Sequence, residues 1–124
     1  MKKAIASKAA PLAIGPYSQA IEANGLIFVS GQIAVDRAGT LAGGGVAEQT
    51  ERAIGTLAAI LESAGASLES VVKTTVFMTD LGQFAAMNEV YARHFKTPCP
   101  ARATVQVSAL PKGASVEIEA VAVR

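Results

Sequence analysis

The sequence has few of the residues that most often carry chemistry. It contains one histidine (His94), one cysteine (Cys99) and no tryptophan, and aromatic residues make up only 5% of its 124 positions. A single cysteine excludes an internal disulfide, and one histidine with one cysteine is too small a ligand set for a typical zinc site. We therefore expect no bound metal and a core built mainly of Ala, Val, Ile and Leu.

The sequence also lacks an excess of charge and a long apolar run. Its formal net charge is +1, with lysine and arginine scattered along the chain, so nucleic acid is not an expected partner. No apolar run reaches the ~18 residues typical of a membrane helix. Lys2 and Lys3 are not followed by the apolar stretch of a signal peptide, which predicts a cytoplasmic location. The length suits a single domain over residues 1–124.

The first half of the chain reads as a hairpin followed by a helix. Leu26–Val35 has the composition of a strand, and Asn24–Gly25 before it is a strong hairpin signal, with a partner strand at about Ser18–Ala23. Val46–Ala64 carries apolar residues at helical spacing, with Gly65 placed to cap its C-terminus. The apolar stripe of this helix consists of Ala47, Thr50, Ile54, Leu57 and Leu61, with Ala53 and Ile60 beside it.

The second half predicts a strand, a helix and a pair of strands. Val71–Thr79 is rich in β-branched residues. Asp80–Gln83 resembles a capping box before a second amphipathic helix, whose stripe is Phe84, Met87, Tyr91 and Phe95 and which Pro98 ends. Two further strands follow, at Arg102–Ser108 and Ser115–Val123, with a turn at Leu110–Gly113 between them.

These elements predict an α+β fold with two helices on one face of a mixed sheet. The other face should then be polar, yet Leu26, Phe28, Val121 and Val123 fall on it. We infer that another subunit covers part of this face. A monomer with a tolerated mixed face is the alternative.

Arg102 and two glutamates are the main candidates for chemistry. Arg102 follows Pro98 and Pro100, which fix the approaching backbone, and its guanidinium could hold a planar carboxylate by two parallel hydrogen bonds. Glu117 and Glu119 point to one face of their strand. If the last two strands pair antiparallel, that face also carries Arg102, Thr104 and Gln106, and a glutamate there could orient water or accept a proton. A structural ion pair and solvated carboxylates are the alternatives.

Four other residues each have a structural interpretation as well as a functional one. Tyr17, after Gly15-Pro16, is either presented rigidly by that turn or simply packed. Asn88 lies one position beyond the apolar stripe of the second helix, where a solvent-facing amide is expected. Cys99 has no basic neighbour in the sequence that would activate a thiol, and His94 reads as an exposed residue near a helix C-terminus.

Several segments taken together resemble the YjgF/RidA family over nearly the whole chain. Each is weak alone, but their order and spacing are specific. They are Ala13–Ala20, Phe28–Ile33, Val72–Leu81, the residues Phe84, Asn88 and Tyr91, and then Pro100–Arg102, Leu110–Lys112 and Val116–Ala122.

The resemblance implies a chorismate-mutase-like α+β fold and a homotrimer with a central barrel-like core and active sites between subunits. It implies hydrolysis of 2-aminoacrylate-type enamines, through their imines, to 2-oxoacids and ammonia, without a cofactor. Arg102 would bind the substrate carboxylate and Glu117 would hold the attacking water. Tyr17, Ser30, Gly31, Asn88 and Thr104 would line the pocket.

The resemblance leaves one position and three functions open. The deaminase branch of the family often has a cysteine where this chain has Thr104, which leaves substrate range and rate undetermined. A non-catalytic carboxylate-binding module could use the same clefts. Ribonuclease activity or inhibition of translation has been described in the family, although the near-neutral charge argues against it here. Chorismate mutase activity rests on fold analogy alone.

Overall fold

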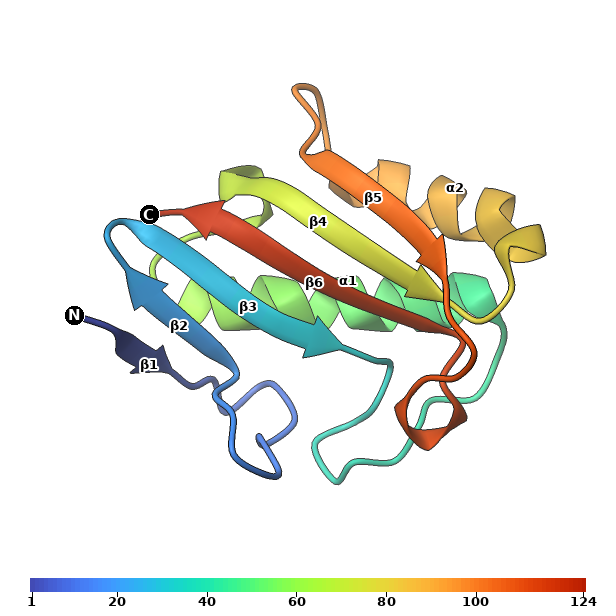
Figure 1. Ribbon diagram of the computed structural model, residues 1–124, viewed down its shortest axis with the longest axis horizontal. Coiled ribbons are helices and arrows are strands. Elements are labelled where there is room, and N and C mark those ends of the chain that lie inside the picture. The colour runs from blue at the N-terminus through green and yellow to red at the C-terminus, as the bar shows by residue number, and fades with distance from the viewer.

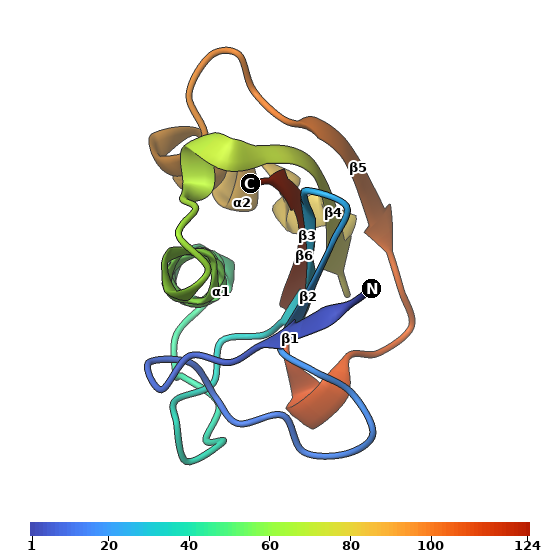
Figure 2. The same cartoon turned by 90° about the vertical axis from the view of Figure 1, so that its left-hand side faces the viewer.

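A six-stranded mixed sheet forms the frame of the computed structural model, which describes residues 1–124. The strands lie in the order β1-β2-β3-β6-β4-β5, and both helices pack on one face of the sheet (Figures 1 and 2). The elements are β1 Lys3–Ile5, β2 Ala20–Ala23, β3 Leu26–Gln32, α1 Val46–Ser63, β4 Val71–Met78, α2 Phe84–His94, β5 Ala101–Gln106 and β6 Val116–Val123. The predicted α+β class, with two helices on one face, is confirmed. Neither helix is long and apolar enough to span a membrane.

The core lies between the sheet and the two helices. On β6, Val116 and Ile118 are fully buried beneath the helices, and Val76 and Met78 of β4 lie beside them. α1 contributes a row of fully buried side chains to the same core, namely Ala53, Ile54, Leu57, Ile60 and Leu61. The small number of aromatics is thus matched by a core of branched aliphatic residues, as the composition predicts.

Local signals placed the hairpin and α1 correctly. Asn24 and Gly25 both have positive φ, as a two-residue turn between β2 and β3 requires. The Gly65 N–H donates to Glu62 O and the Ala66 N–H donates to Leu61 O, which is the Schellman arrangement that ends a helix. Gly65 adopts the positive φ of that motif and therefore caps α1 as predicted.

Two details of the helices differ from the prediction. Ala47 is exposed, and Gln49 is buried instead because its Oε1 accepts a hydrogen bond from the Ser115 N–H. Asp80 does cap, through a hydrogen bond from the Gly82 N–H to Oδ1 (2.8 Å), but it caps a short 3-10 turn at Leu81–Gln83. The Gln83 side chain makes no return bond, so the predicted capping box is only half formed.

A bulge in β3 reverses the side-chain alternation that the sequence suggested. Val29 pairs with Ala120 and Gln32 pairs with Ile118, so two residues of β3, Ser30 and Gly31, oppose one residue of β6. Gln32 and Ala34 therefore turn toward the buried side, and the strand ends at Gln32 rather than Val35. An unbroken alternation of side-chain faces along the predicted strand Leu26–Val35 is therefore wrong beyond Val29.

β5 does not pair with β6. It pairs in parallel with β4, which lies between them, and β4 pairs antiparallel with β6. The turn predicted at Leu110–Gly113 exists as a 3-10 turn at Pro111–Gly113, but it connects strands that are not neighbours. The predicted antiparallel pair is therefore wrong, which changes where Arg102 lies relative to the glutamates.

Candidate functional site

Arg102 lies on β5 at the sheet edge, and its side chain contacts α2. Its NH1 donates a hydrogen bond to Asn88 Oδ1 (2.7 Å). The guanidinium carbon lies 4.7 Å from the centre of the Tyr91 ring and 5.5 Å from that of Phe84. Because α2 covers one face of the sheet, Arg102 belongs to the helix-covered face. Asn88, expected to face solvent, is half-buried and holds this arginine.

The charge of Arg102 has no counterion within the chain. The ion pairs of the structure join Arg93 to Glu89 and Arg124 to Glu22, and the imidazole of His94 lies beside Glu51; none of these contacts involves Arg102. A structural ion pair is thus excluded as the explanation of Arg102 within one chain. A guanidinium has five N–H donors, and Asn88 takes one. The others can receive a carboxylate from a ligand.

Thr104 lies two residues after Arg102 and therefore on the same side of β5. Its hydroxyl oxygen is shielded from solvent and has no hydrogen-bond partner in the chain. A buried hydroxyl without a partner is costly. The structure thus places an unsatisfied polar group beside the unpaired arginine, which fits the predicted role of Thr104 in binding.

Glu117 lies on the opposite face of the sheet. It alternates along β6 with Val116 and Ile118, which are buried beneath the helices, so its side chain points away from them. Its carboxylate lies directly over Gly31 in the bulge of β3. A Cβ at position 31 would overlap Glu117 Oε2, so a side chain there would force this carboxylate to move.

The surroundings of Glu117 raise the pKa of its carboxyl group above the ordinary value. Partial burial raises the pKa of Glu117, and the neighbouring carboxylate of Glu119 raises it further. No lysine or arginine of the chain pairs with it. A glutamate with a raised pKa can accept a proton from water and return it near neutral pH better than an ordinary carboxylate. Glu119 is more exposed than Glu117.

A groove of about 950 Å³ opens beside Glu117. Tyr17, Ser30 and Gly31 line it together with both glutamates. The Ser30 hydroxyl donates to Ser18 O (2.6 Å), so its oxygen remains available as an acceptor. The Tyr17 hydroxyl accepts from the Ile14 N–H (3.3 Å) and keeps its own hydrogen free. Four of the site residues implied by the family resemblance, Tyr17, Ser30, Gly31 and Glu117, thus meet in one groove.

The structure therefore divides the predicted site into two half-sites. One consists of Tyr17, Ser30, Gly31 and Glu117 on the open face, and the other of Asn88, Arg102 and Thr104 on the helix-covered face. The expectation that Arg102 and Glu117 share a face of one sheet was wrong, because β4 separates their strands and the two side chains point in opposite directions. Within one chain these half-sites cannot enclose a small molecule.

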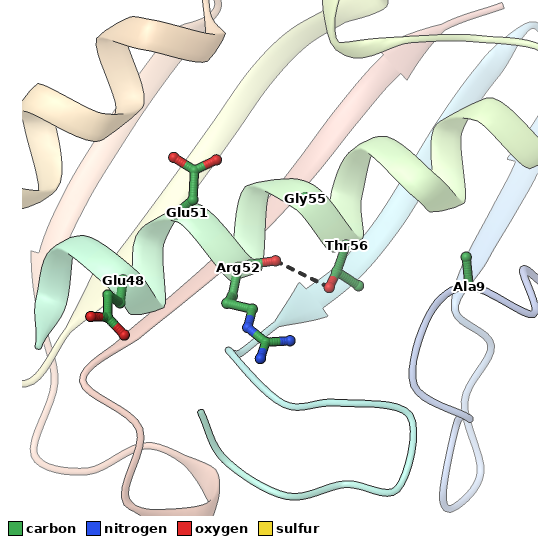
Figure 3. Close-up of a pocket in the computed structure, with 6 residues that line it drawn as sticks. All are labelled: Ala9, Glu48, Glu51, Arg52, Gly55 and Thr56. Carbon is green, nitrogen blue, oxygen red and sulfur yellow. Dashed lines mark hydrogen bonds between the residues drawn. The ribbon is translucent and has the colours of Figure 1, made fainter. Parts of the chain in front are cut away.

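The remaining candidates do not form a second site. His94 Nε2 lies 2.7 Å from Glu51 Oε2 and links the two helices, and Cys99 is exposed with its thiol near Phe95 O. No three His, Cys, Asp or Glu side chains come close enough to hold a metal ion. A shallow hollow on the outer side of α1 is lined by Ala9, Glu48, Glu51, Arg52, Gly55 and Thr56, and its charged side chains point apart (Figure 3).

Sequence reasoning missed the aromatic contacts of Arg102. Phe84 and Tyr91 were expected as part of an apolar stripe and as matches to the family pattern, with no contact to Arg102. Together with Asn88 they occur at positions i, i+4 and i+7, which places all three on one side of a helix. This spacing is a signal that could have identified a single surface around the arginine.

Known proteins match the chain over its full length. The family model described as Endoribonuclease L-PSP matches residues 7–124. A mouse protein named 2-iminobutanoate/2-iminopropanoate deaminase is 46% identical over 100% of this chain and 93% of its own length. A structure of a putative endoribonuclease from Thermotoga maritima superposes with a TM-score of 0.96 at 49% identity, covering 100% of this chain and 98% of that one.

A further solved structure holds a ligand. Escherichia coli TdcF, determined with bound serine, is 40% identical, covers 98% of both chains and has a TM-score of 0.89. The match in sequence and the match in structure agree over the whole chain. The chain therefore belongs to the Endoribonuclease L-PSP family, also called the YjgF/RidA family.

Proposed function

We propose that this protein hydrolyses 2-iminoacids, formed from 2-aminoacrylate-type enamines, to 2-oxoacids and ammonia. The observation that carries the proposal is a pair of unmatched charges: Arg102 and Glu117 have no oppositely charged partner within their own chain. The arginine fits the carboxylate of the substrate and the glutamate fits the water that attacks it. The full-length likeness to relatives named 2-iminobutanoate/2-iminopropanoate deaminase supports the same reaction.

We propose further that the two half-sites come together between subunits of a homotrimer. Arg102 and Glu117 lie on opposite faces of one sheet, so a site that uses both needs two chains. The open face is suited to contact another chain, because it exposes Phe28, Val105 and Val123. One sheet with one main core supports a single domain over residues 1–124. A cytoplasmic location stays a prediction from the sequence.

In the proposed reaction, Arg102 holds the substrate carboxylate by two N–H donors left free by Asn88. Glu117 takes a proton from water as the water oxygen bonds to C2 of the imine, and the electron pair of the C=N bond moves to nitrogen. Glu117 then passes the proton to the amino nitrogen of the tetrahedral intermediate. The hydroxyl proton of this carbinolamine then moves, through Glu117, to the nitrogen as the C=O bond forms and the C–N bond breaks. Ammonia leaves, so one imine and one water give one 2-oxoacid and one ammonia.

The other residues of the site bind and orient the substrate. Tyr17 can donate a hydrogen bond and Ser30 can accept one, as their contacts within the chain leave these valences free. Gly31 brings backbone next to the Glu117 carboxylate. The buried hydroxyl of Thr104 gains a polar partner when a ligand binds beside Arg102. We expect the chain to bind an α-carboxylate strongly and the rest of the substrate mainly by shape.

A coupled assay tests the proposed function. A threonine dehydratase releases the enamine, and semicarbazide traps its imine in competition with hydrolysis. We expect added protein to reduce the trapped amount and to speed formation of 2-oxobutanoate and ammonia. An unchanged trapped amount would favour a carboxylate-binding protein without turnover. RNA cleavage that disappears in both Arg102→Ala and Glu117→Gln would instead assign a nuclease to this site.

A further inference from the structure

One side of α2 is shaped around Arg102. Phe84, Asn88 and Tyr91 follow each other at helical spacing and all three contact the guanidinium or lie within cation–π distance of it. Asn88 makes the only hydrogen bond, and the two rings supply the surface. Their arrangement leaves the other N–H donors of Arg102 without a partner in the chain.

Tyr91 is itself held firmly. Its hydroxyl lies 2.7 Å from the Thr74 hydroxyl, and its ring packs against Phe95 with 4.4 Å between ring centres. Thr74 is the residue of β4 that pairs with Arg102 of β5. The ring is thus anchored to the neighbouring strand at the level of the arginine, and both Tyr91 and Thr74 are buried.

Tyr91 interacts with Arg102 through its neutral ring and not through a phenolate charge. Burial raises the pKa of Tyr91, while the hydrogen bond with Thr74 and the nearby Arg102 oppose the shift with smaller effects. The phenol therefore stays neutral at neutral pH. A neutral ring attracts a cation by its negative face and leaves the positive charge of Arg102 available to an anion.

We propose that Tyr91 is a positioning residue that fixes the Arg102 guanidinium for an α-carboxylate, an inference that rests on the proposed function of the site. A free arginine loses rotamer freedom when it binds. An arginine already held by Asn88 and the Tyr91 ring has lost part of that freedom before the ligand arrives, which strengthens binding. Phe84, at 5.5 Å, provides a second and more exposed ring.

The test must separate positioning from simple core packing. Starting from Tyr91→Phe, which keeps the ring and drops the Thr74 contact, fluorinated phenylalanines at position 91 weaken the negative face of the ring with little change in its shape. We expect the Kd of 2-oxobutanoate, measured by calorimetry, to rise with each added fluorine. Tyr91→Leu should weaken binding about 3- to 30-fold, the range that a cation–π contact allows.

Phe95 provides the matched control. It is a buried ring on the same stretch of chain, it packs on Tyr91, and it has no cation–π contact with Arg102. The same fluorination at position 95 should leave the Kd unchanged. Equal effects at both positions, or none at position 91 with thermal unfolding unchanged, would overturn the proposal.

A second readout does not depend on the reaction. In the free protein, the Tyr91 ring current should shift the Nε–H proton signal of Arg102, and Tyr91→Leu should return that signal toward the value of a solvated arginine. Failure of the wild type to bind or hydrolyse the substrate would overturn the proposed function and leave this signal in place. An Arg102 signal that is the same in both proteins would overturn the positioning role.

Discussion

The two faces of the sheet differ in what they bury. On the helix-covered side, β6 presents Val116, Ile118 and Ala122, all fully enclosed by their own chain. On the open side the same strand presents Glu117 and Glu119 between apolar neighbours, and no helix of the chain covers them. The covered face accounts for the fold. The open face carries apolar and acidic side chains that the fold of one chain does not require, so we attribute them to assembly and catalysis.

Arg102 and Glu117, two charged residues that lack an oppositely charged partner, lie on opposite faces of the sheet. Arg102 is held on the covered side by α2, whereas Glu117 stands on the open side over Gly31. A protein gains no stability from an unpaired, half-buried charge. We therefore interpret both as functional, and substitutions on each face should separate their roles.

The largest effect should come from the open face. Glu117→Gln keeps the shape of the side chain but cannot accept a proton, so turnover in the dehydratase-coupled assay should fall by about 10²- to 10⁴-fold. Binding of 2-oxobutanoate, measured by calorimetry, should persist. Glu119→Gln is the matched control on the same strand and face. If Glu119→Gln abolishes turnover and Glu117→Gln does not, the base has been assigned to the wrong glutamate.

The next effect concerns the covered face. Arg102→Lys retains the positive charge but loses the two parallel N–H donors that fit a carboxylate. We expect kcat/KM to fall roughly 30- to 1000-fold, the equivalent of about 2–4 kcal/mol for a charged, bidentate contact. Arg93→Lys on α2, an exposed arginine in an i,i+4 ion pair, is the control and should leave kcat/KM unchanged. Full activity of Arg102→Lys would exclude a carboxylate clamp.

Stability should distinguish the two faces of β6 directly. Ile118→Ala removes a fully buried side chain and should lower the free energy of unfolding by about 2–5 kcal/mol. Val123→Ala, at a position exposed in the single chain and on the face that we assign to subunit contact, should cost less than about 1 kcal/mol within one chain. Any larger loss should come from assembly and should therefore depend on protein concentration. Urea unfolding at two protein concentrations measures both variants, and equal losses that do not change with concentration would mean that the open face is as important to the fold as the covered one.

The smallest effect is a shift in pH dependence. The proposed base works only when ionised, so kcat/KM should fall as the pH drops through the raised pKa of Glu117. Glu119→Gln removes the second cause of that raised pKa and leaves burial, the larger one. The acid limb of the profile should therefore move to lower pH without disappearing. A shift to higher pH would contradict the assigned interaction between the two glutamates.

The sequence predicted the helices and strands more accurately than it predicted how the strands pair. Asn24–Gly25 and Gly65 carry local signals, and both turned out as expected because they depend only on nearby backbone. The bulge at Ser30–Gly31 could not be recognised from the alternation of residues along the strand, since its extra residue has the composition of an ordinary strand position. The place of β5 depends on long-range pairing with β4, which a turn signal at Leu110–Gly113 cannot reveal.

The candidate site was likewise predicted in its residues but not in their arrangement. The residue types and the family resemblance selected Arg102 and Glu117, but not the face on which each lies. From the pattern of α2 alone, Asn88 was expected to face solvent. Its contact with Arg102 crosses from α2 to β5, and a helical pattern does not reveal such a contact. The unpaired state of Arg102 and Glu117 is a property of the folded chain, and it supplies the argument for a site shared between subunits.

Subunit mixing tests the central claim, a site built from two chains, most directly. Arg102→Ala and Glu117→Gln are each expected to be inactive. When the two variants are unfolded together in equal amounts and refolded, about a quarter of the interfaces in a randomly mixed cyclic trimer should join an intact Arg102 to an intact Glu117. We predict that about this fraction of wild-type activity returns on mixing. Refolded mixed trimers without recovered activity would contradict the shared site.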